Sequence, residues 1–212
     1  VLLVNLGTPE APSADAVRRF LAEFLWDPRV VEVPRPIWWF VLNGLILNTR
    51  PGRSAKAYQK IWTAEGSPLL LSSQRQRTAL AARLEQRFGC KIPVALGMRY
   101  GQPSIPSALA GLQDVGVRRL LVLPLYPQYS ATTTASIFDA VSDELQRWRW
   151  LPELRFINHY HDDPAYIRAL ADSVRRFQAE HGEPDKLILS FHGIPREYFL
   201  AGDTYFCECQ KT

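Results

Sequence analysis

The stretch Lys186 to Pro195, KLILSFHGIP, decides the fold that the sequence predicts. Its apolar run, broken only by Ser190, is typical of a short strand buried on both faces in a parallel sheet. His192 follows where this strand should end, and the glycine and proline after it favour a turn. Ligands bind at the carboxyl ends of such strands, so His192 is a candidate catalytic residue. The plainer interpretation is a histidine that stiffens the turn through hydrogen bonds.

Outward from this stretch, short apolar runs alternate with segments of helical periodicity. The apolar runs predict further strands at 1–6, 92–96, 119–125 and 154–158. The helical spacing predicts helices at 13–26, 54–62, 72–88, 104–114, 137–148 and 163–182. Strands that alternate with helices of this length predict an α/β fold with a doubly wound, Rossmann-like parallel sheet.

Polar and aromatic residues follow several of these predicted strands. The carboxyl ends of parallel strands meet at one edge of a sheet, so we expect the segments after them to lie along that edge. These segments are Leu6 to Thr8, Arg99 and Tyr100, Tyr126 to Thr134, His159 and Tyr160, and His192. Loops are polar in any protein, but these hold most of the Arg, Tyr and His residues that fit no helix face. The sequence therefore predicts a ligand site at this edge.

The segment from Pro34 to Leu47 departs from regular patterns. It is too apolar for an ordinary loop, and its prolines argue against a clean helix or strand. Its aromatic residues fit a small core under a long loop, the lip of a pocket for a flat apolar ligand, or a patch that rests on a membrane surface. The apolar run at 37–47 is too short to span a bilayer, which takes roughly 20 residues.

Composition narrows the class of protein. Of 212 residues, 47% are hydrophobic and 22% charged, which indicates a globular rather than a disordered chain. The formal net charge is +4, but the basic pairs are scattered over separate predicted elements, so no nucleic-acid groove is expected. Three cysteines and no signal peptide favour a reducing compartment and hence a cytoplasmic protein. Both ends look cut, so a fragment is expected.

Several common motifs are missing from the sequence. Neither the Gly-x-Gly-x-x-Gly fingerprint nor the phosphate-binding Gly-x-x-x-x-Gly-Lys-Ser/Thr pattern occurs, which argues against a dinucleotide or nucleoside triphosphate. The Gly-x-Ser-x-Gly pattern of esterases is missing too. The predicted sheet therefore serves another kind of ligand.

Six stretches together resemble the ferrochelatase family, whose members insert ferrous iron into protoporphyrin IX. They are Val4 to Pro9, Gly66 to Leu69, Gly97 to Tyr100, Pro124 to Thr134, Ser190 to Pro195 and Gly202 to Tyr205. The resemblance implies two similar Rossmann-like halves with the porphyrin between them. Residues 1–160 would form the first half, with an apolar lip at 34–50, and residues 161–212 would begin the second.

The resemblance also implies roles for individual residues. His192 matches the histidine that binds the metal and takes up pyrrole protons. The positions that match porphyrin contacts or pocket walls are Leu6, Arg50, Tyr58, Ser67, Arg99, Tyr100 and Tyr126. The family pairs its histidine with a glutamate from a later segment, and Glu197 and Glu208 are expected at the surface instead.

The expected reaction is the insertion of Fe²⁺ into protoporphyrin to give protohaem and two protons. Alternatives are a related chelatase for coproporphyrin, sirohydrochlorin or cobalt, and an inactive porphyrin-binding module. No cofactor beyond the substrate iron is expected, because Ala131 stands where members with an iron–sulfur cluster carry a cysteine. Cys207 and Cys209 have a spacing that could hold a soft metal but are expected to be unremarkable. Peripheral membrane contact is expected through residues 34–47.

Overall fold

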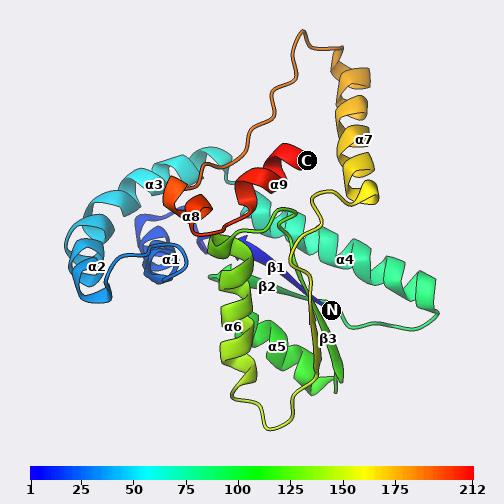
Figure 1. The fold of residues 1–212 in the computed structure, drawn as a ribbon, viewed down its shortest axis with the longest axis horizontal. Helices are drawn as coiled ribbons and strands as arrows, with labels where there is room; N and C mark the ends of the chain where they lie inside the picture. Colours follow the sequence, from blue (N-terminus) through cyan, green and yellow to red (C-terminus); the bar gives the residue numbers. More distant parts are fainter. The chain divides into compact units, whose positions relative to one another are not determined.

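The computed structural model describes all 212 residues, which form two compact units (Figure 1). The first comprises Val1–Leu125 and Ala131–Ile157, and we call it the sheet unit. The second comprises Tyr126–Ser130 and Asn158–Thr212, and we call it the helical unit. The division of the whole protein into halves at residue 160 stays a prediction.

The sheet unit contains four parallel strands in the order β2-β1-β3-β4. Their bounds are β1 Leu2–Gly7, β2 Ala95–Tyr100, β3 Arg119–Pro124 and β4 Glu153–Phe156. The chain steps from β1 to one side and then returns past β1 to the other, so the sheet is doubly wound as predicted. Leu2, Leu3 and Val4 of β1 are buried, as expected of an inner parallel strand, whereas β3 alternates between buried and partly buried side chains.

Helices cover both faces of this sheet. They are α1 Ala14–Trp26, α4 Pro68–Phe88, α5 Ile105–Asp114 and α6 Ser136–Leu145. Leu96 and Met98 belong to a core cluster with leucines of α4. Gly97, between them, faces α5 on the opposite side, where an added Cβ would lie 3.2 Å from the Ile105 Cα. This glycine therefore marks a close approach of helix and strand. The predicted strand at 92–96 is displaced along the chain: β2 runs from Ala95 to Tyr100 because it pairs with β1 over that range.

A second glycine closes β1. Gly7 has a φ of 106°, and a Cβ at this position would lie within van der Waals overlap of the Tyr100 carbonyl oxygen. Only glycine adopts this conformation without strain. The loop after β1 thus passes directly over the end of β2.

The region from Pro34 to Ile61 is helical, which corrects the prediction that its prolines break regular structure. It consists of α2 Arg35–Val41, a π-helical turn Leu42–Ile46 and α3 Leu47–Ile61. Pro36 lies in the first turn of α2, where no intrahelical N–H is needed. Pro51 lies inside α3 and removes the hydrogen bond to the carbonyl oxygen of Leu47. Arg18 of α1 replaces it, because its Nη1 donates to that oxygen at 2.7 Å.

We expect Arg18→Met to lower the free energy of unfolding by about 1–2 kcal/mol, because it leaves the buried Leu47 carbonyl without a donor. Urea unfolding measures the change. Arg19→Met is the matched control, since Arg19 pairs only with Glu10 and both side chains are more than half exposed. The control should change stability by less than about 0.5 kcal/mol. Equal effects of the two substitutions would contradict this account of how α3 tolerates Pro51.

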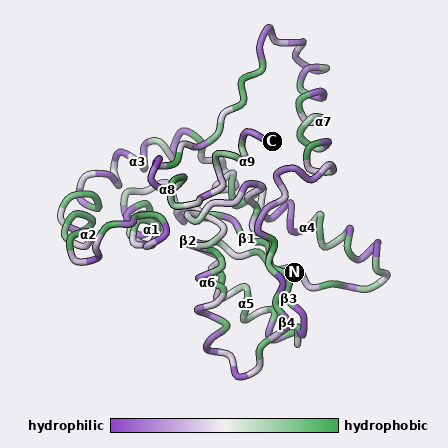
Figure 2. The backbone as a smooth tube through the Cα atoms, viewed as in Figure 1, coloured by the Kyte–Doolittle hydropathy of each residue, from purple (hydrophilic) through white to green (hydrophobic).

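The helical unit contains α7 Pro164–His181, α8 Arg196–Leu200 and α9 Tyr205–Lys211. Asp163 caps α7 as predicted, because its side chain accepts hydrogen bonds from the N–H groups of Ala165 and Tyr166. The strand predicted at the start of the KLILSFHGIP stretch is wrong for this structure, in which residues 182–195 are irregular and mostly exposed. Figure 2 shows its apolar part as a green segment between α7 and α8. A strand needs neighbours that pair with its backbone groups, and none of the strand pairings or isolated bridges includes this stretch.

None of the helices combines the length and hydrophobicity that crossing a lipid bilayer requires.

Candidate functional site

His192 lies in the turn between the apolar stretch and α8, as an exposed side chain of the helical unit. Its Nδ1 is 2.6 Å from the carbonyl oxygen of Gly193. A carbonyl oxygen can only accept, so this contact holds the neutral ring in the tautomer with its proton on Nδ1. The backbone N–H of His192 donates to the Tyr205 hydroxyl at 3.3 Å, which fixes the turn from the other side. The lone pair of Nε2 is therefore left to accept a proton or bind a metal ion.

A pocket of about 420 Å³ lies beside His192 within the helical unit. Its lining is mostly apolar and includes Phe191, Ile194, Phe199 and Phe206. Arg196 is the one cationic residue among the lining side chains. The pocket thus places an imidazole and a guanidinium at an aromatic surface, an arrangement suited to an apolar ligand that carries an acidic group.

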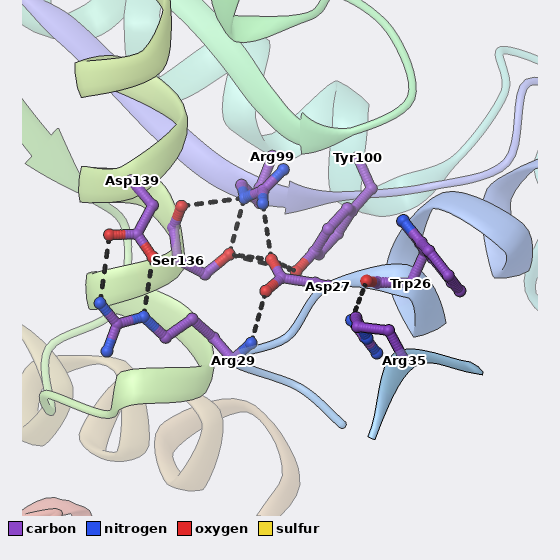
Figure 3. A network of polar contacts seen from close by, with 8 residues as sticks. All are labelled: Trp26, Asp27, Arg29, Arg35, Arg99, Tyr100, Ser136 and Asp139. Atoms are coloured by element: carbon purple, nitrogen blue, oxygen red, sulfur yellow. Dashed lines mark hydrogen bonds and ion pairs between the residues drawn. The ribbon is translucent and has the colours of Figure 1, made fainter. Parts of the chain in front are cut away.

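Arg99 and Tyr100, at the carboxyl end of β2, belong to a polar network within the sheet unit (Figure 3). Asp27, the residue that ends α1, is its centre. One carboxylate oxygen of Asp27, Oδ2, accepts from Arg99 Nη2 at 2.6 Å, from the Tyr100 hydroxyl at 2.8 Å and from the Ser136 hydroxyl. Arg99 Nε also donates to the carbonyl oxygen of Ser136 at 3.0 Å. The network ties the ends of α1 and β2 to the start of α6.

Burial governs the protonation of this network. Burial alone would raise the pKa of Asp27, but hydrogen bonds from Ser136, Tyr100 and the Arg29 N–H, together with the Arg99 charge, bring it below its usual value. The pKa of Tyr100 is raised, chiefly by burial, so its hydroxyl stays protonated and donates. The Asp27 carboxylate is therefore the anion that Arg99, Tyr100 and Ser136 share, and Arg99 is its counter-ion.

The predicted site residues divide between the two units. Tyr126 and His192 belong to the helical unit, and the other six belong to the sheet unit. Tyr100 is fully buried and Arg99 is largely buried, and both are engaged by Asp27. Whether these residues bind a ligand stays a prediction.

Four further predicted residues lie on β1, α3 and the start of α4. Leu6 is half-buried near the end of β1, and its N–H donates to the Asn5 side chain rather than to a neighbouring strand. Arg50 is exposed on α3, where Tyr58 is half-buried and packs edge-on against Trp62. Ser67 is buried at the N-cap position of α4.

Sequence reasoning missed the acidic residues that organise both units. Asp27 follows the predicted first helix without any motif around it, so its neighbours Arg99 and Ser136 could be found only from the fold. Glu208, expected at the surface, is 5% exposed, and that expectation was wrong. The signal that could have found it is the pair of histidines, His159 and His161, that follows the predicted strand at 154–158. Two histidines so close together suggest an acidic partner, and the sequence alone assigns them none.

Cys207 and Cys209 both lie on α9, where one is exposed and the other is buried. Residues two positions apart on a helix point in different directions, so the two thiols do not converge on a common ion. The Cys-x-Cys spacing therefore does not form a metal site in this fold.

Comparison with known proteins identifies the family. A family model described as ferrochelatase matches residues 1–212. Proteins named ferrochelatase from Marinobacter nauticus and Thioalkalivibrio sulfidiphilus are both 58% identical to the whole chain, and one from Nitrosomonas europaea is 53% identical. The chain spans 57–58% of the length of these relatives. The match over every residue, together with a doubly wound parallel sheet, shows that the chain belongs to the ferrochelatase family.

Proposed function

We propose that the protein inserts ferrous iron into protoporphyrin IX, with His192 as the residue that binds the metal and accepts pyrrole protons. The observation that carries this proposal is the state of the His192 ring. Its Nδ1–H is held by the Gly193 carbonyl, and its Nε2 is free beside an aromatic pocket. In metal-binding histidines, the N–H of the second ring nitrogen commonly donates a hydrogen bond to a carbonyl oxygen in this way.

Iron insertion requires a group that can bind the metal and accept protons. Iron insertion forms bonds from Fe²⁺ to four pyrrole nitrogens and releases two protons. A neutral imidazole ligates iron and accepts a proton near neutral pH, so Nε2 can serve at either stage and pass each proton on to water. Contacts of the apolar rim with the macrocycle can support bending of the ring, which turns the nitrogen lone pairs toward one face.

Cationic and apolar side chains suit the rest of the porphyrin. Arg50 is exposed and suited to a propionate, and Arg196 of the His192 pocket offers a second guanidinium. Leu6, Tyr58, Ser67 and Tyr126 are the proposed wall of the site. We assign Arg99 and Tyr100 to positioning, because their polar groups are engaged by Asp27 and hold the end of β2.

Absorption spectroscopy of the full-length protein tests the activity. Binding of protoporphyrin shifts its Soret band, whereas insertion of iron or zinc collapses the four free-base visible bands into two. Protoporphyrin, coproporphyrin and sirohydrochlorin are compared as substrates under anaerobic conditions. Fast turnover of protoporphyrin supports the proposal. Preference for either of the other tetrapyrroles supports the alternative chelatase, and a Soret shift without collapse supports a binding module.

The proposed location is the cytoplasm, with peripheral contact to a membrane through residues 34–47. Support comes from Ile37, Trp39, Phe40 and Leu45, whose side chains are 51–70% exposed. Exposure of such an apolar patch to water is unfavourable, and its transfer to a lipid interface lowers the free energy. Sedimentation with anionic vesicles checks this contact, and Phe40→Ser should weaken it.

We also propose that the protein holds no iron–sulfur cluster, because Ala131 replaces the expected cysteine ligand. Analysis of the anaerobically purified full-length protein for iron and acid-labile sulfide tests this, and stoichiometric sulfide would contradict it.

A further inference from the structure

Two histidines and a glutamate meet in the helical unit, apart from the His192 pocket. His159 and His161 lie in the segment before α7, and Glu208 lies on α9. Each histidine presents its Nδ1 to a different oxygen of the same carboxylate. His159 Nδ1 is 3.2 Å from Oε1, and His161 Nδ1 is 3.1 Å from Oε2. The candidate donor atoms of all three residues lie within 4.8 Å of one another.

Burial makes this cluster unlike a surface ion pair. The side chains of His161 and Glu208 are 2% and 7% exposed. Neither ring nitrogen of His161 has a hydrogen-bond partner, although Nδ1 lies only 3.1 Å from a carboxylate oxygen of Glu208. Buried polar atoms are almost always satisfied, so this ring nitrogen requires a partner. A cation between the imidazole and the carboxylate would supply it.

Two of the donor separations fit a metal ion. Bonds of about 2.1 Å from a divalent ion to nitrogen and oxygen place adjacent donor atoms roughly 3.0–3.4 Å apart, depending on the coordination geometry. Both nitrogen-to-oxygen separations in the cluster fall in this interval. Two imidazoles and one carboxylate are a donor set that zinc and ferrous iron both accept.

Outer contacts hold the Glu208 carboxylate in place. The Glu208 carboxylate accepts from the Tyr129 N–H at 2.7 Å and from the Thr204 hydroxyl at 2.8 Å. Hydrogen bonds on a ligating carboxylate are typical of metal sites.

We propose that His159, His161 and Glu208 bind one divalent transition-metal ion of the zinc or ferrous class. The side chain of His159 is 52% exposed, which gives the ion a route from solvent and leaves room for water as a further ligand. The ion ties the segment after β4 to α9 and so stabilises the helical unit. The site shares no residue with the His192 pocket and does not depend on the proposed catalytic role of His192.

Metal titration of the full-length protein tests the site. The protein carries His192→Ala, so that the proposed catalytic ligand is absent, and it is first freed of metal with a chelator. Zn²⁺ is followed by calorimetry, and Co²⁺ by its visible ligand-field bands. We expect one high-affinity ion per chain and a rise in melting temperature with Zn²⁺. His159→Gln should weaken binding at least tenfold and remove the rise.

His181→Gln is the matched control, because His181 is an exposed histidine on α7. It should bind as the parent does. Glu208→Gln removes the central ligand, and a circular dichroism spectrum establishes whether it folds. Since His159 is half exposed, its variant tests the site even if Glu208→Gln unfolds. Absence of binding by the parent, or unchanged binding by His159→Gln, would overturn the proposal and leave an ion-paired cluster. Iron insertion is measured separately in protein with an intact His192.

Discussion

His192→Ala in the full-length protein should lower the rate constant for iron insertion by at least about 100-fold, the smallest loss typical of removing a proton-transfer residue. The substitution removes Nε2, which the hydrogen bond from Nδ1 to Gly193 leaves free for metal and protons. Anaerobic turnover with Fe²⁺ and with Zn²⁺ measures the loss, and the quenching of porphyrin fluorescence measures binding. Porphyrin affinity should change much less than the rate, because the aromatic lining of the pocket remains.

His181→Ala is the control for this substitution, since it deletes an exposed imidazole elsewhere in the same unit. It should leave turnover unchanged. Insertion of zinc or iron by His192→Ala at the parent rate would show that the assigned role is wrong. A large loss of porphyrin affinity with an unchanged rate constant would make His192 a binding residue instead.

Local patterns predicted most of the sheet unit, because its strands and helices carry their own signals. The apolar positions of α1 recur at helical spacing, and Val17, Phe20 and Leu25 are buried as that spacing requires. Leu2, Leu3 and Val4 of β1 are buried, and this too follows from the residues alone. Gly89 ends α4 where the sequence places it, and in the helical unit Asp163 caps the start of α7 as predicted.

Tertiary partners decided the features that the sequence did not reveal. Residues 187–191 have the composition of a strand, but pairing depends on a neighbouring strand and not on composition. The prolines at 36 and 51 are compatible with helix because one lies in a first turn and the other has Arg18 to satisfy the freed carbonyl. Glu208 is buried because His159, His161 and the Thr204 hydroxyl surround its carboxylate. The two histidines lie far from it in sequence, so no local pattern predicts this burial.

Asp27→Ala should lower the free energy of unfolding by about 3–5 kcal/mol, the range for removing one partner of a buried charged pair. The Asp27 side chain is 2% exposed, and without its carboxylate the hydroxyls of Tyr100 and Ser136 and the Arg99 guanidinium lose their shared acceptor (Figure 3). Asp139→Ala is the matched control. Asp139 also pairs with an arginine, but both side chains of that pair are more than a third exposed, so the loss should stay below about 1 kcal/mol. Urea unfolding of both variants measures the difference.

The same carboxylate predicts a pH dependence. The pKa of Asp27 is lower in the folded protein than in the unfolded chain, so folding releases a proton from this group when the pH lies between the two values. Its contribution is therefore complete above the unfolded pKa, about 3.9, and is lost as the pH falls from there through the folded value. Asp27→Asn keeps the shape but cannot titrate, so its stability should fall less than that of the parent between pH 5 and the acid limit of folding. Parallel pH profiles would contradict the assignment of Asp27 as the anion that holds α1, β2 and α6 together.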